Sequence, residues 1–114
     1  MNTIVIDESA LESMESLLGE QFSDTLTFCC TEFERLGAEV LSTIHNDEQV
    51  ACRHAHSLKS NAAQFGASSL SDVAREIEQN LNNGDTVKAI SASEQLDGQV
   101  AGSKAKLVDW LQSR

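Results

Sequence analysis

The chain has 114 residues, of which 40% are hydrophobic, and its 18 acidic and 8 basic residues give a formal net charge of −10. This length fits one domain, and the hydrophobic fraction is too high for a disordered chain. The negative charge argues against nucleic-acid binding and against anionic membrane surfaces, because the field of the whole molecule would repel phosphate groups.

Several sequence features bear on the cellular compartment. No apolar run approaches the roughly 20 residues that span a bilayer, and the N-terminus lacks the basic and apolar regions of a signal peptide. The cysteines Cys29, Cys30 and Cys52 form an odd set without CxxC spacing, which suits a reducing compartment. We therefore expect a cytoplasmic protein with no membrane contact, and the net charge favours a monomer.

Helices are predicted along the whole chain, because proline is absent and breaks fall at glycine and at Asn/Asp clusters. Asp7 can cap a short N-terminal helix that carries Leu11, Met14 and Leu17. The next helix spans about residues 20–45, where apolar residues alternate at spacings of four and three. These residues are Phe22, Leu26, Cys29, Phe33, Leu36 and Val40.

A third helix follows Asn46 or Asp47, either of which can cap it, and it ends near Gly66, where a left-handed residue is expected. Its apolar seam has the same spacing and comprises Ala51, Ala55, Leu58, Ala62 and Phe65. Ser69 and Asp72 resemble a capping box for a fourth helix. The inner face of that helix comprises Leu70, Val73, Ile77 and Leu81.

The sequence NNGD at residues 82–85 predicts a turn, and Asp85 can cap a last helix over about residues 86–112. Gly98 and Gly102 each cost about 1 kcal/mol of helix propensity, so we expect a kink or a close backbone contact there. The seam of this helix comprises Ala89, Ala92, Leu96, Val100, Ser103, Leu107 and Trp110. Together the segments predict an all-α fold in one domain, residues 1–114: an antiparallel four-helix bundle with a short N-terminal accessory helix.

Helical geometry separates the two histidines of the sequence HAHSLKSNAAQFGA, residues 54–67. At about 100° per residue, His56 lies roughly 140° from the centre of the seam and faces solvent, whereas His54 falls at the edge of the buried stripe. The residues predicted on the same face as His56 are Cys52, Ser60 and Ala63, within about 40°, and Arg53 and Lys59, at about 60° on either side.

Charge also distinguishes this stretch, because residues 49–71 contain no Asp or Glu but include Arg53 and Lys59. We interpret the stretch as a cationic island, although an ordinary scatter of charge on a helix face explains it about equally well. A neighbouring ammonium would favour the neutral, nucleophilic form of His56 and would attract a bound phosphoryl group.

At these residues the sequence resembles the histidine-containing phosphotransfer (HPt) domains of multistep two-component phosphorelays. The family motif reads approximately His-x-Leu-Lys-Gly-small-small-x-x-apolar-Gly-Ala. The matching residues here are His56, Leu58, Lys59, Ser60, Asn61, Ala62, Phe65, Gly66 and Ala67. Ser60 departs from the more usual glycine, so somewhat tighter docking is expected. Within the family, HSLKSNAAQFGA is most similar to the shuttles of Vibrio-type quorum-sensing relays.

The resemblance implies a phosphorelay carrier and not an enzyme. His56 would accept a phosphoryl group from an aspartyl phosphate on the receiver domain of a hybrid sensor kinase, and would pass it to the aspartate of a response regulator. Lys59 would stabilise the phosphoryl charge. The docking surface would comprise Cys52, Arg53, Ser60, Ala63 and Ala67. The chain would need no cofactor of its own, because the partner receiver domain would supply Mg²⁺.

Other classes of function remain open on the residues alone. Cys52 and His56 could share a metal ion, but His54 points about 160° away, and two ligands from one helix do not make a stable zinc site. A catalytic pair of Cys52 and His56 would lack an oxyanion site and a pocket. A bundle that only binds other proteins would explain the fold and the acidity, but not the cationic island.

Overall fold

The computed structural model describes residues 3–114, which form helices joined by short turns. The helices are α1 Glu8–Leu18, α2 Phe22–Thr43, α3 Glu48–Gln64, α4 Ser68–Asn82, α5 Thr86–Ser93 and α6 Leu96–Gln112, with a 3-10 turn, η1 Gly19–Gln21, before α2. The described residues contain no strand, so the all-α prediction is confirmed.

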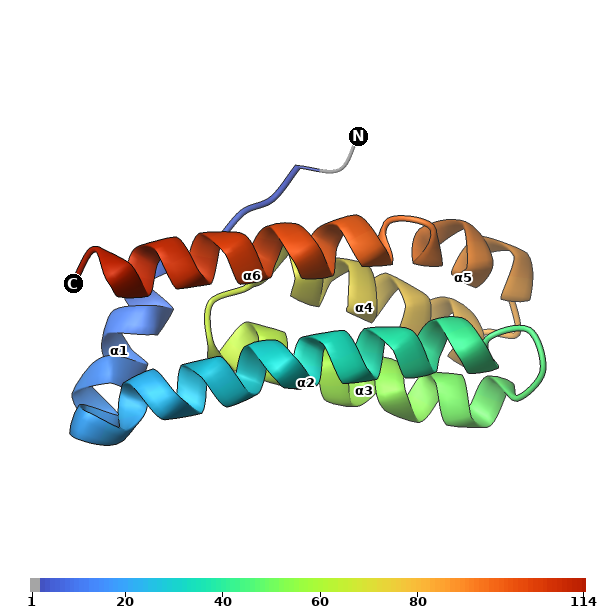
Figure 1. Cartoon of the computed structure of the whole chain (residues 1–114). Helices are drawn as coiled ribbons and strands as arrows, with labels where there is room; N and C mark the ends of the chain where they lie inside the picture. Colours follow the sequence, from blue (N-terminus) through green and yellow to red (C-terminus); the bar gives the residue numbers. More distant parts are fainter. Residues whose placement is uncertain (1–2) are drawn as a thin grey trace.

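The long helices run antiparallel to their neighbours along the chain (Figure 1). Helix α3 packs against α2 and α4, and α6 also packs against α2 and α4, so that these four helices close a ring. Helix α1 covers the end of the bundle where α2 begins and α6 ends (Figure 1). The architecture is therefore the predicted bundle with an N-terminal accessory helix, to which α5 adds a further short helix.

The predicted apolar seams form one core. Every seam residue predicted for α2, α3 and α4 is at most 8% exposed. Burial of each large aliphatic or aromatic side chain contributes about 1.5–3 kcal/mol relative to exposure. The seam of α3 is unusual because three of its members, Ala51, Ala55 and Ala62, are alanines with no exposed surface. Small side chains at a contact allow helix axes to approach closely, so α3 can lie tightly between α2 and α4.

The last predicted helix, residues 86–112, is wrong as a single element. The α-helical hydrogen-bond pattern is interrupted at Glu94 and Gln95, although both residues keep right-handed helical dihedral angles, and this interruption divides the segment into α5 and α6. Helix α6 is continuous through Gly98 and Gly102. The predicted close contact does occur at Gly102, where a Cβ atom would lie 2.5 Å from Cδ1 of Ile4. All predicted seam residues on both sides of the break are buried.

Aspartate side chains cap three helices as predicted. Asp7 accepts hydrogen bonds from the backbone N–H groups of Ser9 and Ala10 at the start of α1. Asp47 accepts one at the start of α3, from Val50, and Asp85 accepts one at the start of α5, from Lys88. Each cap satisfies a backbone donor that the first turn of a helix leaves unpaired.

The predicted capping box at Ser69 and Asp72 is wrong. Helix α4 begins at Ser68, directly after Ala67, and its first turn has no side-chain cap. Ser69 Oγ instead accepts a hydrogen bond of 2.9 Å from the backbone N–H of Val5 and donates one of 2.7 Å to Gln99 Oε1 on α6. Ser69 therefore connects the N-terminal segment to α6.

The N-terminal segment also contacts the turn between α3 and α4. The backbone N–H of Asp7 donates a hydrogen bond of 2.7 Å to the carbonyl of Gly66, whose φ of +76° confirms the predicted left-handed residue. In α1, Leu11 is buried and Met14 packs against the core. Leu17 is 76% exposed, so its predicted place on the covering face is wrong, and Leu18 packs there instead.

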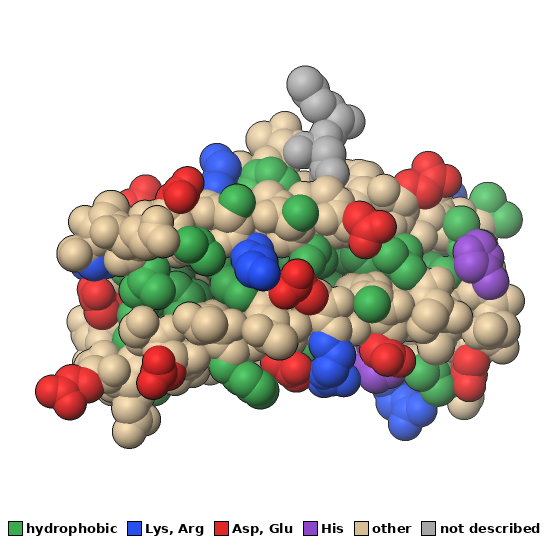
Figure 2. Space-filling model, in the orientation of Figure 1, with side chains coloured by type: hydrophobic (Ala, Val, Ile, Leu, Met, Phe, Trp, Pro, Cys, Tyr) green, Lys and Arg blue, Asp and Glu red, His purple; other side chains and the backbone are tan. Residues whose placement is uncertain are grey.

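The surface of the bundle is mixed in character. Figure 2 shows hydrophobic side chains along the seam between α6 and α2, with acidic and basic side chains on both sides of it. Within residues 3–114, no helix is both long enough and apolar enough to cross a lipid bilayer.

Candidate functional site

His56 lies near the middle of α3, on the face opposite the buried alanines. Its side chain is 61% exposed, as the helical geometry predicts. One ring nitrogen, Nδ1, lies 2.6 Å from Oε2 of Glu78, which belongs to α4. An ionised carboxylate can only accept hydrogen bonds, so this contact assigns a proton to Nδ1. The other nitrogen, Nε2, then carries the free lone pair of the neutral ring.

Glu78 holds a second partner with its other oxygen. The ammonium of Lys59 donates a hydrogen bond of 2.6 Å to Glu78 Oε1, so one carboxylate bridges the histidine and the lysine. The side chain of Glu78 is only 13% exposed. Its burial acts to raise the pKa of the carboxyl, but the hydrogen bonds from Lys59 and His56 outweigh burial and hold the pKa below its usual value. Glu78 is therefore ionised at neutral pH.

This carboxylate corrects the prediction of a cationic island. The stretch without acidic residues is real in the sequence, but α4 places Glu78 against Lys59 in the fold. The argument that Lys59 alone would favour neutral His56 therefore does not hold, because a carboxylate contacts the ring directly. The site is a hydrogen-bonded triad of Lys59, Glu78 and His56, from two neighbouring helices.

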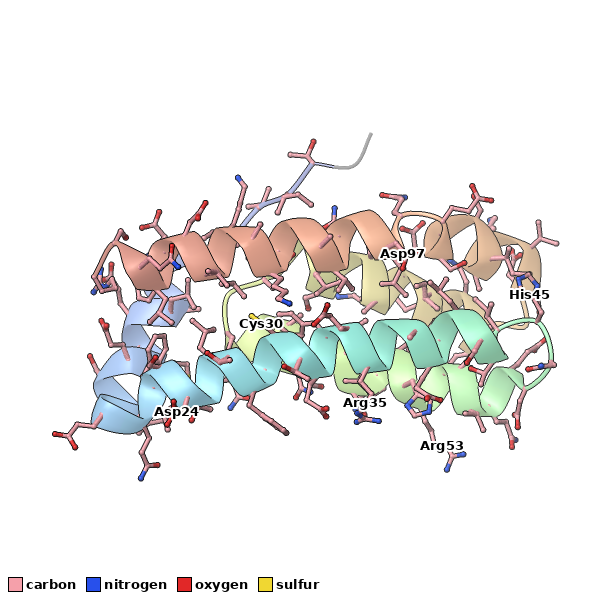
Figure 3. The ribbon with its side chains drawn as sticks, viewed as in Figure 1. Asp24, Cys30, Arg35, His45, Arg53 and Asp97 are labelled. Carbon is pink, nitrogen blue, oxygen red and sulfur yellow. The ribbon has the colours of Figure 1, made fainter. Side chains whose placement is uncertain are left out.

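Of the five predicted docking residues, four lie at or near the surface around His56. Arg53, Ser60 and Ala63 are exposed, and Cys52 is partly exposed. Arg53 projects from α3 on the same side of the bundle as Arg35 from α2 (Figure 3). The fifth predicted docking residue is Ala67.

Ala67 does not belong to this surface. It has no exposed area, because it precedes α4 and packs into the core at the end of α3. The motif that suggested Ala67 therefore includes a core residue at this position.

His54 occupies a different environment, as predicted from its place on the helix. Its side chain is 26% exposed, and its Nε2 lies 3.7 Å from Oε2 of Glu39 on α2. The two histidines thus face different neighbouring helices, with different ring nitrogens turned toward a carboxylate.

Cys52 lies one turn before His56, and its sulfur contacts atoms of α4. Its Sγ lies 3.3 Å from Oδ1 of Asn82 and 3.9 Å from the carbonyl of Glu78. Burial is the main reason that the pKa of the Cys52 thiol is raised, and the charge of Glu78 raises it further. In residues 3–114, no three His, Cys, Asp or Glu side chains gather as a metal site would require.

Comparison with known proteins identifies the family. The model of the Hpt domain family matches residues 8–106, which is most of the chain. This chain belongs to the Hpt domain family. The Hpt domains are phosphotransfer carriers rather than kinases, and they act with receiver domains in phosphorelays. No curated protein sequence matches the chain significantly.

Solved structures share the fold of this Hpt domain at low sequence identity. The histidine-containing phosphotransfer protein HptB from Pseudomonas aeruginosa aligns with a TM-score of 0.88 and 20% identity, covering 96% of each chain. Histidine-containing phosphotransfer proteins from rice and maize align with TM-scores of 0.79 each, at 18% and 19% identity. They cover 94% of this chain and 81% and 83% of their own chains. The narrower likeness to quorum-sensing shuttles stays a prediction.

Glu78 was missed by the sequence analysis of this Hpt domain. One usable signal is its position beside Ile77, at the edge of the predicted inner face of α4. A second is the antiparallel turn at Gly66, because His56 lies ten residues before it and Glu78 lies twelve residues after it. Residues at similar distances from such a turn lie at similar heights on the two helices. The pairing of α3 with α4 could therefore have suggested the contact.

Proposed function

We propose that this Hpt domain carries its phosphoryl group on Nε2 of His56. The observation that supports this most is the contact between Nδ1 and Glu78, at 2.6 Å, on a side chain that remains 61% exposed. An exposed nitrogen with a free lone pair can reach the recessed aspartyl phosphate of another protein. His54 is less exposed, and its Nε2 faces Glu39.

In the proposed step, the lone pair of Nε2 attacks the phosphorus of an aspartyl phosphate on a receiver domain. A nitrogen–phosphorus bond forms, the bond from phosphorus to the aspartate oxygen breaks, and its electron pair leaves with the aspartate carboxylate. The ring keeps its proton on Nδ1 and becomes cationic. The Glu78 carboxylate accepts a hydrogen bond from that Nδ1–H, so it opposes the charge that develops on the ring. Reversal of the step with a second receiver aspartate completes the relay.

Lys59 has two roles in this proposal. Before transfer it donates to Glu78 and so fixes the carboxylate that holds His56. After transfer its ammonium provides positive charge near the phosphoryl oxygens, which charge-assisted hydrogen bonds favour. Because phosphoryl transfer depends mainly on alignment and charge stabilisation, this triad is sufficient on the carrier side.

The partners in this proposal are the receiver domain of a hybrid sensor kinase upstream and the receiver of a response regulator downstream. The receiver would supply Mg²⁺, and the Hpt domain would act as a monomeric carrier without a kinase reaction of its own. The exchange would take place in the cytoplasm. Support for that compartment comes from Cys29, Cys30 and Cys52, which are all free thiols.

The test is transfer of radioactive phosphoryl groups from a phosphorylated receiver domain in the presence of Mg²⁺. We expect label on one histidine, in an adduct that acid hydrolyses and alkali leaves intact. His56→Gln should abolish the label, whereas His54→Gln should keep it, which makes His54 a matched control from the same helix. Label that persists at the wild-type level in His56→Gln would overturn the assignment.

A further inference from the structure

Helices α2 and α3 border a hollow of about 200 Å³ that is open to solvent, on the α2 side of α3. Its lining contains the apolar side chains of Phe28, Cys29 and Phe65 and a polar edge that includes Asn61 and Gln64. Cys29 and Phe65 are each 5% exposed and form the floor. A dry cavity of about 150 Å³ holds a benzene molecule, so this hollow can admit one aromatic or branched aliphatic side chain.

Phe28 differs from the other aromatic residues of the chain. Phe22, Phe33, Phe65 and Trp110 are between 0% and 7% exposed, whereas Phe28 is 64% exposed. It also falls outside the spacing of the α2 seam, so the core of the bundle gives no reason for an aromatic side chain at this position. Exposed aromatic residues beside apolar hollows with polar edges are typical of the residues that dominate protein–protein binding energy.

The hollow lies within reach of a partner that is centred on His56. Gln64 follows His56 by eight residues, which is about 12 Å along the helix axis and about 80° around it. A stable interface covers about 800 Å² of each partner, equivalent to a disc with a radius of about 16 Å. The surface between His56 and Gln64 includes Ser60 and Ala63, which are exposed and small. No bulky side chain of α3 therefore separates the histidine from the hollow.

We propose that this hollow, with Phe28 at its edge, receives an apolar side chain of the receiver domain while His56 reaches the receiver's aspartate. This inference rests on the proposed function, because the receiver is the partner that must cover His56. The docking residues predicted from the sequence lie on α3 and at Ala67. The proposal adds a docking contact on α2. The polar triad lies on the other flank of α3, toward α4, so the two flanks have separate tasks.

The experiment compares Phe28→Ala and Phe28→Leu with Val87→Ala, a control on α5 whose side chain is 79% exposed. A panel of isolated receiver domains, phosphorylated with phosphoramidate and Mg²⁺, is tested against the wild-type chain, and the fastest donor is kept. The rate of transfer is then measured against the concentration of that receiver. In parallel, phosphoramidate alone labels each Hpt variant without any receiver.

We expect Phe28→Ala to lower kcat/KM for transfer about tenfold or more, mainly through a higher KM, as loss of a binding hot spot does. Phe28→Leu should keep more of the rate, and Val87→Ala should match the wild type. Direct labelling by phosphoramidate should be equal in all chains, because a small donor needs no docking surface. Circular dichroism of each variant should show the wild-type thermal transition, because both positions are exposed.

Three results would overturn the inference while leaving the proposed function intact. The first is a wild-type kcat/KM in Phe28→Ala. The second is an equal loss in the direct labelling reaction, which would place the effect at His56 itself. The third is a wild-type dimer in sedimentation velocity that Phe28→Ala dissociates, since a second copy would then occupy the hollow. If neither donor labels His56 in the wild-type chain, the proposed function fails, and this inference fails with it.

Discussion

Helix α3 carries two histidines two residues apart, and each faces a glutamate from a neighbouring helix. His56 lies 2.6 Å from Glu78, whose side chain is 13% exposed, and His54 lies 3.7 Å from Glu39, whose side chain is 47% exposed. His56 uses Nδ1 for this contact and His54 uses Nε2. The two histidines therefore differ in the distance and exposure of the paired carboxylate and in the ring nitrogen that faces it.

The two sites differ in what holds the carboxylate and which nitrogen remains available. Lys59 donates to Glu78, so the glutamate of the His56 site is fixed from two directions. A half-exposed glutamate such as Glu39 forms a weaker pair, because water screens it and its side chain keeps more freedom. Under the proposed function, burial of the carboxylate, rather than its presence, would prepare a histidine for transfer.

Among changes to the residues that contact the two histidines, removing the carboxylates in turn should show the largest effect. Glu78→Ala should slow transfer from a phosphorylated receiver by about tenfold to a hundredfold, whereas Glu39→Ala should change it less than twofold. Loss of the buried aspartate in Ser-His-Asp enzymes costs about 10⁴-fold, and a smaller loss is expected here because His56 is exposed to water. Equal rates in the two variants would mean that Glu78 has no special role.

Glu78→Gln separates the position of the oxygen from its charge. The amide oxygen can still accept from Nδ1–H but carries no negative charge, so an intermediate rate is expected. Nitrogen NMR of the imidazole rings provides a readout that mere structural damage would not reproduce. Neutral His56 should carry its proton on Nδ1 in the wild type and should shift toward the Nε2–H form in Glu78→Ala. A wild-type spectrum in that variant would contradict the positioning role.

Lys59 donates a hydrogen bond directly to Glu78, a contact that no lysine or arginine among residues 3–114 makes to Glu39, and its removal should have the next largest effect. Lys59→Ala should slow transfer about tenfold, because one charge-assisted hydrogen bond to the phosphoryl group is lost. Lys88→Ala is the matched control, since Lys88 also pairs with a carboxylate, at 3.7 Å from Asp85, but on α5. Full transfer by Lys59→Ala would show that Lys59 neither stabilises the phosphoryl charge nor positions Glu78 for transfer.

The triad should also affect stability in a pH-dependent way. The pKa of Glu78 is lowered in the folded chain, so its ionised form stabilises the fold above the unfolded pKa of about 4.3, and this contribution disappears as pH falls through the folded pKa. Chemical unfolding should show Glu78→Gln to be less stable by about 1 kcal/mol at pH 5 and above. The difference should shrink toward pH 3. A difference that grows on acidification would reverse the assigned sign.

The smallest expected effect is on the stability of the histidine variants themselves. His56→Ala should change the free energy of unfolding by about 0.5 kcal/mol or less, because an exposed side chain contributes little. His54→Ala should cost a similar or slightly larger amount, since that ring is more buried. A large loss of thermal stability in His56→Ala would mean that the ring supports the fold, and would weaken the contrast between the two sites.

The core of this Hpt domain could be predicted because alternating spacings of four and three residues locate the buried stripe of each helix. The break at Glu94 and Gln95 could not, since the buried spacing continues across it from Ala92 to Leu96. Spacing reports which side chains are buried and says little about the backbone between them. The short polar turn carries no glycine or proline that would mark it.

The candidate site was predictable only within one helix. The exposed position of His56 and the buried edge position of His54 follow from 100° per residue. The bridge from Glu78 to Lys59 and His56 depends on how α4 is placed against α3, which no pattern within α3 contains. The predicted capping role of Ser69 was wrong for a related reason, because its hydrogen bonds to the N-terminal segment and to α6 lie outside its own helix. The predicted exposure of Ala67 was wrong because this residue packs into the core.

Two turns of the chain contain a glycine with a φ of +76°, and they should tolerate change very differently during evolution. At Gly84 a Cβ atom would meet nothing within 4 Å, whereas at Gly66 it would lie 2.5 Å from the carbonyl oxygen of Asp7. The turn at Gly66 also sets the height of Glu78 relative to His56. Among relatives of this chain, we expect the turn at Gly66 to keep its length and its glycine. At Gly84, where only the positive φ favours glycine, we expect insertions and replacement by residues such as Asn to occur more often.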